Sequence, residues 1–379
     1  MNILIAGDLA PTQSNVNAFI EGHTKSLLGE DMFSIWNAAD MRVFNLEVPL
    51  TDQENPINKC GPNLITPTST VNGIKALNPS LIALANNHIL DQGVHGLKST
   101  IDILNENRIP FVGAGESLSQ ASKPYVIEHE GLKIAVYNCA EHEFSIATSE
   151  KPGANPFDPL ESLDHILEQK SKCDYVIVLY HGGKEHYRYP SPSLQKVCRK
   201  MVEKGADLVV CQHSHCVGAY EEYNEATIVY GQGNFIFNEL DNEYWNSSVL
   251  IDVNIQDKLS VKYIPIVTTQ KGICLAKDRD KENILGSFKR RSEEILVEGF
   301  IEKEYEAFAK KNSDFYLRRF LGFGNWIIRI DRRIFRGYLL KRKTEQSYLL
   351  AVQNYIECES HRELLLMGLV QYRKDEKGR

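Results

Sequence analysis

Three histidines at the ends of apolar runs are the residues of this chain best placed to do chemistry. His181 follows the run 175–180, and the pair His213 and His215 follows the run 208–211. Short apolar runs are typical of buried strands, and parallel strands end at one common edge of their sheet. Imidazoles at such ends should converge, and neutral imidazoles that converge bind metal ions. The pattern therefore predicts a metal site.

Polar side chains also stand at the ends of other apolar runs. Asp8 follows the first run of the chain, Glu47 follows another, and Asn87 and His88 follow a third. Each of these residues alone has a common structural explanation, such as capping a turn. Open α/β sheets assemble ligand sites where strands give way to loops, so the strand ends together predict one shared site.

The residue types fit a centre that binds two divalent cations for hydrolysis. Such a centre needs a bridging carboxylate between cations roughly 3.5–4 Å apart and a water whose pKa is lowered. We expect Asp8 and His215 to bind the first cation and Glu47 to bridge the two cations. The second cation would be bound by Asn87, His181 and His213. His88 lies outside this set and would protonate the leaving oxygen or hold a phosphate oxygen.

Composition limits the class of protein. The chain has 379 residues and a formal net charge of -7, which argues against a dedicated nucleic-acid binder. The start of the chain lacks the pattern of a signal peptide, and no apolar run approaches the length of about 20 residues that spans a membrane. We therefore expect a cytoplasmic protein.

Periodicity predicts two domains. Up to about residue 245, strand-like runs alternate with helix-like stretches, which indicates an α/β domain with a parallel or mixed sheet. The clearest predicted helices are 71–78, 96–107, 159–172 and 193–204. The segments 248–255 and 259–267 alternate with period two and predict an antiparallel hairpin. Residues from about 280 onward have helical spacing, so we predict domains at 1–275 and 280–379.

One part of the helical region is strongly basic. The segment 314–343 contains nine Arg or Lys residues against two Asp, interleaved with aromatic and aliphatic residues. A basic amphipathic helix can lie on an anionic membrane surface, and the same pattern arises when a helix packs on its own domain or on a partner. Gly322 and Gly324 are expected to divide this helix.

An ordered set of motifs carries a family resemblance. Along the chain these are Gly7-Asp8, Asn45-Leu46-Glu47, Ala85-Asn86-Asn87-His88 with Asp91 and Gly93, His181-Gly-Gly-Lys-Glu185, His213-Ser-His215 and Gly233-Asn234-Phe235. They resemble the motifs of the CapA family, the poly-gamma-glutamate capsule-synthesis type of protein within the calcineurin-like metallophosphatase superfamily. The resemblance covers about residues 1–267 and stops before the helical region.

The resemblance implies both a fold and a site. The fold would be a four-layer α/β/β/α metallophosphatase-like sandwich of mixed sheets, here followed by a C-terminal helical extension. The site would hold one or two divalent metal ions, Mn, Fe or Zn, on the six ligands named above. By the same motifs His88 is the catalytic histidine, and Asn234 and Glu185 are substrate-binding residues.

The motifs also depart from the wider superfamily. Its first motif is Asp-x-His, but Ala10 stands at the histidine position, and Glu47 replaces the aspartate of the second motif. The glycine that usually precedes the histidine pair is Gln212. The first cation therefore has one nitrogen ligand fewer than the superfamily pattern.

We expect a bacterial metallophosphoesterase-type hydrolase of capsule or cell-surface polymer biosynthesis. Its substrate would be a small-molecule or polymer-precursor phosphoester. Two alternatives stay open: a non-catalytic component of a polymer synthesis or export assembly docked through the basic tail, and hydrolysis of an amide, because a Lewis-acid metal activates water against a carbonyl as well. The C-terminal helices would contact polymer-synthesis proteins or the inner face of the membrane.

Overall fold

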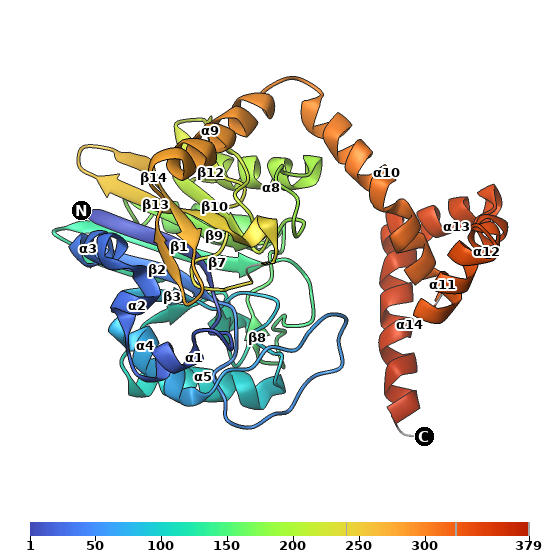
Figure 1. The fold of residues 1–379 in the computed structure, drawn as a ribbon, viewed down its shortest axis with the longest axis horizontal. Coiled ribbons are helices and arrows are strands. Elements are labelled where there is room, and N and C mark those ends of the chain that lie inside the picture. The colour runs from blue at the N-terminus through green and yellow to red at the C-terminus, as the bar shows by residue number, and fades with distance from the viewer. Residues whose placement is uncertain (240, 323, 378–379) are drawn as a thin grey trace. The chain divides into compact units, whose positions relative to one another are not determined.

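A computed structural model of the chain describes residues 1–239, 241–322 and 324–377 (Figure 1). By their contacts, these residues divide into two compact units, Met1–Glu302 and Lys303–Arg379. No helix in this part of the chain is both long and apolar enough to cross a membrane.

The first unit extends past the predicted end of the α/β domain. Helix α9 (Asp278–Glu294) packs on strands of this unit, and its Phe288 is part of the core. The domain bounds 1–275 and 280–379 stay a prediction. Residues 323, 378 and 379 of the predicted second domain lie outside the described residues.

One sheet carries the N-terminal strands. Within the described residues it contains seven strands, and β1 to β4 run parallel at its centre and edge while β13 to β15 pair antiparallel. In sheet order the strands are β15 (Ile273–Leu275), β14 (Leu259–Thr268), β13 (Ser247–Ile255), β1 (Asn2–Leu9), β2 (Met41–Leu46), β3 (Leu81–Ala83) and β4 (Phe111–Val112). The predicted hairpin is confirmed as β13 and β14.

The second sheet carries the strands that precede the three histidines. Within the described residues it contains six strands, of which β7, β9, β10 and β12 are parallel neighbours. In sheet order they are β11 (Tyr220–Tyr223), β12 (Ala226–Val229), β10 (Leu208–Gln212), β9 (Tyr175–His181), β7 (Leu132–Ala140) and β6 (Tyr125–His129). Two short strands, β5 (Ala114–Gly115) and β8 (Gly153–Ala154), pair separately.

The two sheets pack face to face. One apolar cluster joins Ile5 and Val43 of the first sheet to Ile177 and Val210 of the second, so the inner face of each sheet covers the other. Burial of each such side chain contributes on the order of 1.5–3 kcal/mol. The strands are apolar on both faces because both faces are covered.

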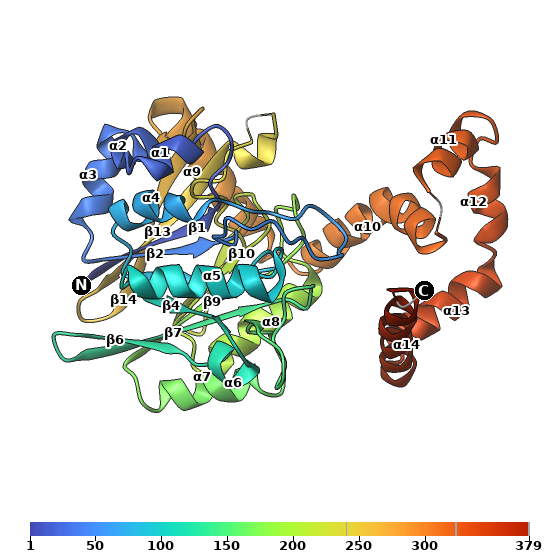
Figure 2. The same ribbon diagram turned by 90° about the horizontal axis from the view of Figure 1, so that it is seen from below.

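Helices cover the outer faces and complete four layers in the described part of the chain (Figure 2). Helices α1 (Val16–Ile20), α2 (Thr24–Leu28), α3 (Glu30–Ala38), α4 (Val71–Ala76) and α5 (Gly93–Glu106) pack on the first sheet. Helices α7 (Ser162–Lys170) and α8 (Pro192–Glu203) pack on the second, and the short α6 (Leu118–Ala121) follows β5. The predicted α/β/β/α sandwich and its four clearest helices are confirmed.

The helix starts differ in detail from the prediction. The N-cap of α8 is Ser191, whose hydroxyl accepts a hydrogen bond from the backbone N–H of Leu194 at 3.1 Å, and Pro192 occupies the first turn. Proline suits that turn because its missing N–H would be unpaired there in any case.

The second unit is helical, as expected. It begins within α10 (Phe300–Phe320), whose first three residues belong to the first unit. Its other helices are α11 (Asn325–Arg333), α12 (Tyr338–Lys343), α13 (Gln346–Glu357) and α14 (Glu359–Lys377). The helix boundary between α10 and α11 falls at the predicted glycines, and Gly322 has a positive φ of 69° that terminates α10.

Candidate metal centre

The predicted ligands lie at the carboxyl ends of strands in both sheets. Asp8 is in β1 and Glu47 directly follows β2, whereas His181 ends β9 and the His213–His215 pair follows β10. Asn87 and His88 come shortly after β3. Since the sheets face each other, these strand ends meet at one edge, and the structure brings all six predicted ligands together there.

A local irregularity in β1 directs Asp8 into the site. The register between β1 and β2 shifts between Ile5 and Asp8, and Asp8 forms an isolated parallel bridge with Asn234. Bulges of this kind re-aim a side chain near a functional site. Gly7 allows the close approach, because a Cβ built there would lie 1.9 Å from the backbone oxygen of Gly233.

Replacing Gly7 with alanine should therefore destabilise the fold by about 3 kcal/mol, because the strand or the 231–235 segment must move away. Denaturant unfolding of the metal-free protein measures this. Gly286→Ala is the matched control. Gly286 lies in α9, and apart from the adjacent residues and backbone of its own helix no described atom stands within 4 Å of the added Cβ. Helix propensity makes this change neutral or stabilising. Equal stabilities of the two variants would refute the steric argument.

The histidine pair has an unusual backbone. His213 has a φ of 80° and His215 a φ of 53°, a left-handed region that non-glycine residues seldom adopt. The N–H of His213 donates to Asp8 Oδ2 at 3.1 Å, which helps to hold this turn. Strained backbone of this type concentrates at functional sites.

Asp8, Glu47 and His215 form one potential cation site. Their ligand atoms all lie within 4.8 Å of one another. His215 Nδ1 is 3.5 Å from Asp8 Oδ2, and its Nε2 is 3.9 Å from Glu47 Oε1. The arrangement matches the first cation position predicted from the sequence.

A second group consists of Glu47, His181 and His213, whose ligand atoms also lie within 4.8 Å of one another. His181 Nε2 lies 3.4 Å from Glu47 Oε1 and 3.1 Å from Asn87 Oδ1, so the amide oxygen belongs to the same cluster. Glu47 is common to both groups, which is the position required of a bridging ligand.

Burial favours the neutral forms of the ionisable groups in the cluster. Burial, and then the neighbouring charge of Asp8, raise the pKa of Glu47 to about 8. Burial lowers the pKa of His181 and of His213, so both rings are neutral at pH 7. Within the described residues, neither carboxylate oxygen of Glu47 nor Nδ1 of His213 has a hydrogen-bond partner. Buried polar atoms are seldom left in this state, and a divalent cation would satisfy all of them.

His88 lies beside the cluster rather than inside it. Its Nε2 is 4.0 Å from Glu47 Oε1, and its Nδ1 is 2.5 Å from Asp91 Oδ2. Lys59 forms a buried ion pair with Asp91, and the Lys59 side chain is only 2% exposed. The carboxylate thus orients the imidazole with Nε2 toward the cluster. Sequence reasoning missed Lys59, because it lies in a segment without strand or helix periodicity.

The two predicted substrate-binding residues differ in position. Asn234 is buried, and its Oδ1 lies 2.8 Å from Nδ1 of His215, where it can fix the tautomer of that ring. Glu185 instead lines an open cavity of about 400 Å³ next to the cluster. Glu185 is therefore placed to meet a substrate, whereas Asn234 is placed to orient a ligand.

The cavity has an aromatic and acidic lining. It is bounded by Pro62, Leu64, His88, Glu185, His186, His215, Phe237, Asn238, Glu239 and Trp245. The ring of Trp245 lies 4.7 Å from that of His215, and its indole N–H donates to His186 Nε2 at 3.0 Å. Trp245 and Phe237 carry no motif that would have indicated this role.

Residues 2–239 match the family model described as bacterial capsule synthesis protein PGA_cap. The chain belongs to this family. The family resemblance recognised in the sequence motifs is thereby confirmed, and the match ends before α9 and the C-terminal helices.

Curated relatives of the PGA_cap chain include two Bacillus proteins. This chain is 33% identical over 209 residues to the PGA biosynthesis protein CapA of Bacillus subtilis. The aligned region covers 54% of this chain and 55% of the relative. This chain is 32% identical over 204 residues to the capsule biosynthesis protein CapA of Bacillus anthracis, covering 52% and 49%. The chain thus spans about half the length of the curated relatives it matches.

Solved structures resemble the PGA_cap chain at low sequence identity. A hypothetical protein from Thermus thermophilus has a TM-score of 0.47 and 13% identity, covering 71% of this chain and 100% of that one. A phosphatase from Mycoplasma pneumoniae has a TM-score of 0.45 and 14% identity, covering 70% and 93%.

Proposed function

We propose that this chain is a metal-dependent phosphoesterase of capsule or cell-surface polymer biosynthesis. The observation that carries the proposal is Glu47, a fully buried carboxylate that two ligand groups share and whose oxygens lack hydrogen-bond partners among the described residues. The names of the Bacillus relatives support the biosynthetic context.

The chain's own residues would supply the remaining chemistry. Divalent cations held by the two groups would lower the pKa of water and neutralise charge on a phosphoryl group. His88 is placed to donate a proton from Nε2 to the leaving oxygen, while Asp91 holds its Nδ1 and Lys59 balances the charge of Asp91. Asn234 keeps Nε2 of His215 directed at the cluster.

The cavity lining favours a leaving group that carries a ring and no negative charge. Glu185 and Glu239 would repel a polyanion such as a glutamyl polymer, and none of the described lining residues is a lysine or arginine. Carboxylates accept hydrogen bonds from hydroxyl groups, and Trp245 and Phe237 offer ring surfaces. A phosphoester of an uncharged, hydroxyl-rich precursor fits this lining.

The test is hydrolysis by the purified full chain with and without added manganese. We expect turnover of p-nitrophenyl phosphate or bis-p-nitrophenyl phosphate that disappears on chelation and returns with the metal. Turnover that survives chelation, or metal-loaded protein that cleaves neither ester, would overturn the proposal. Release of amine from a γ-glutamyl amide by a protein inactive on both esters would indicate the amide alternative.

A second candidate function is a metal-retaining but non-catalytic component of a polymer synthesis assembly. The observation that favours it is the buried Ala10 at the histidine position of the superfamily motif, which leaves the first group with His215 as its one imidazole among the described residues. Protein that binds one metal ion per chain without any turnover would support this candidate over the enzyme.

A further inference from the structure

The C-terminal unit exposes large apolar side chains around α11 and α12. Trp326 is 75% exposed and Ile334 is 68% exposed, and other exposed apolar residues nearby are Phe315, Phe320, Phe335 and Tyr338. Large apolar side chains that are exposed together on a folded unit indicate an interaction site. A partner for this surface must be able to contact both aromatic and aliphatic side chains.

A buried ion pair presents these side chains on a fixed scaffold. Arg318 of α10 donates to Asp331 Oδ2 of α11 at 2.6 Å, and both side chains are buried. The other carboxylate oxygen of Asp331 accepts from the backbone N–H of Leu339 in α12 at 2.9 Å. One carboxylate thus joins the end of α10 to α11 and α12, so the exposed residues belong to one structured surface.

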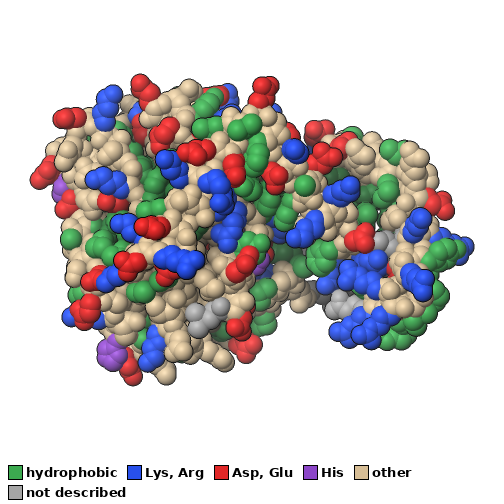
Figure 3. Space-filling view, turned by 45° about the horizontal axis from the view of Figure 1, so that its top comes forward, with side chains coloured by type: hydrophobic (Ala, Val, Ile, Leu, Met, Phe, Trp, Pro, Cys, Tyr) green, Lys and Arg blue, Asp and Glu red, His purple; other side chains and the backbone are tan. Residues whose placement is uncertain are grey.

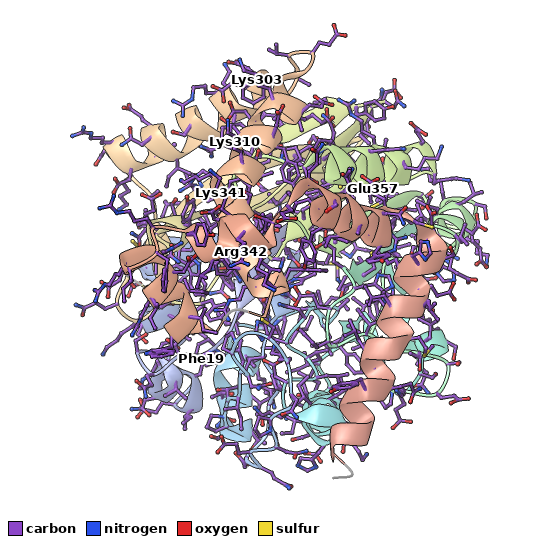
Figure 4. All side chains as sticks on the ribbon, turned by 90° about the vertical axis from the view of Figure 1, so that its right-hand side faces the viewer. Phe19, Lys303, Lys310, Lys341, Arg342 and Glu357 are labelled. Atoms are coloured by element: carbon purple, nitrogen blue, oxygen red, sulfur yellow. The ribbon has the colours of Figure 1, made fainter. Side chains whose placement is uncertain are left out.

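The same surface is densely cationic. Arg329, Arg332 and Arg333 of α11 are exposed, as are Arg336 and the run Lys341-Arg342-Lys343 at the end of α12. Between residues 315 and 344 the sequence contains one acidic residue, Asp331, and that carboxylate is buried against Arg318. Figure 3 shows Lys and Arg side chains gathered beside hydrophobic ones on the C-terminal helices, and Figure 4 labels Lys341 and Arg342 among them.

The spacing in α11 separates the two kinds of side chain. At 100° per residue, Trp326, Ile327 and Ile330 occupy one arc of the helix. Arg329, Arg332 and Arg333 occupy the adjoining arc, in which Arg333 lies next to Trp326. A helix with an apolar face and a basic face is the pattern that lies in the plane of an anionic membrane. A mixture of aliphatic and aromatic side chains suits the boundary between lipid headgroups and acyl chains. Sites for single-stranded nucleic acid instead combine basic residues with aromatic rings on which the bases stack.

We propose that α11, α12 and the end of α10 bind the surface of a membrane that contains anionic phospholipid. Trp326 and Ile334 enter the boundary between headgroups and acyl chains, and the arginine and lysine side chains contact lipid phosphates. Each cation near such a surface strengthens binding roughly fivefold, and salt weakens this contribution. The surface lies in the second unit, so the proposal is independent of the metal centre.

The experiment is flotation of the full chain with vesicles of phosphatidylcholine alone or mixed with phosphatidylglycerol. We expect binding to the mixed vesicles, a loss in high salt, and no binding to phosphatidylcholine. The triple variant Arg329→Gln, Arg332→Gln, Arg333→Gln should bind on the order of 100-fold more weakly. Trp326→Ser should weaken binding while the salt dependence remains.

The matched control removes three other exposed cations. Lys303, Lys310 and Lys311 lie on α10 outside the proposed surface, and Lys303 and Lys310 are labelled in Figure 4. Their triple change to glutamine should leave binding within about twofold of the wild type, and far-ultraviolet circular dichroism checks that each variant stays helical. Equal losses in the two triple variants, equal binding to neutral vesicles, or binding of a short DNA duplex in place of vesicles would overturn the proposal.

Discussion

Replacing His88 with asparagine is expected to lower phosphoester hydrolysis by about 10²–10⁴-fold while the metal content stays unchanged. The reason is its position: Nε2 points toward the cluster, yet His88 is outside both ligand groups. An acid assists most when the leaving group is a poor one. The loss in kcat should therefore be larger for an alkyl phosphate than for p-nitrophenyl phosphate, whose leaving oxygen needs little protonation.

The control for this variant is His95→Asn, an exposed histidine of α5 that should keep wild-type activity and metal content. Metal analysis of both proteins separates proton transfer from metal binding. An equal loss with both leaving groups would contradict the role of His88 as an acid, and a loss of metal from the His88 variant would place it among the ligands.

Replacing Glu47 with glutamine should have the second large effect, the loss of metal from both cation positions. The two ligand groups share this carboxylate, so one substitution weakens both. Elemental analysis after dialysis should find metal in the wild type and close to none in the variant. Wild-type metal content in Glu47→Gln would rule out a bridging role.

The same residue predicts a pH dependence for the metal-free protein. The pKa of Glu47 is raised from an ordinary value of 4.5 to about 8, mainly by burial. The folded state therefore binds a proton between these values that the unfolded state has released, so the free energy of unfolding falls as pH rises from about 4.5 to about 8. The slope is up to about 1.4 kcal/mol per pH unit.

Denaturant unfolding between pH 5 and pH 8, after chelation, measures that slope. Glu47→Gln should lose it, whereas Glu106→Gln, a change at an exposed carboxylate, should keep it. Added metal should reverse the trend, because cation binding requires the ionised carboxylate and strengthens as the pH rises. A metal-free wild type whose stability is constant over this range would contradict the assignment.

Much of the fold was predictable because both faces of the central strands are covered. Runs such as 175–180 and 208–211 are apolar throughout, and each ends in a polar residue at the sheet edge. That contrast located His181, His213 and His215, and the period-two pattern located the hairpin β13 and β14. Convergence of the ligands followed from the rule that parallel strands end at one edge.

Other parts of the site depend on contacts that no local pattern encodes. Lys59 reaches Asp91 from a segment without regular structure, and Trp245 reaches His215 from a short 3-10 helix. The predicted contact of Asn234 with substrate stays a prediction; what the sequence did not indicate is the contact of its Oδ1 with His215 Nδ1. The first unit includes α9 because Phe288 packs between strands, which composition alone did not indicate.

The carboxylate of Asp91 also connects the cavity wall to the imidazole of His88. Besides Lys59 and His88, it accepts a hydrogen bond from the backbone N–H of Leu64 at 2.6 Å, and Leu64 lines the cavity. The wall of the cavity and the orientation of His88 therefore share one anchor. Replacing Asp91 is therefore expected to disturb the cavity wall at Leu64 and the orientation of His88 together.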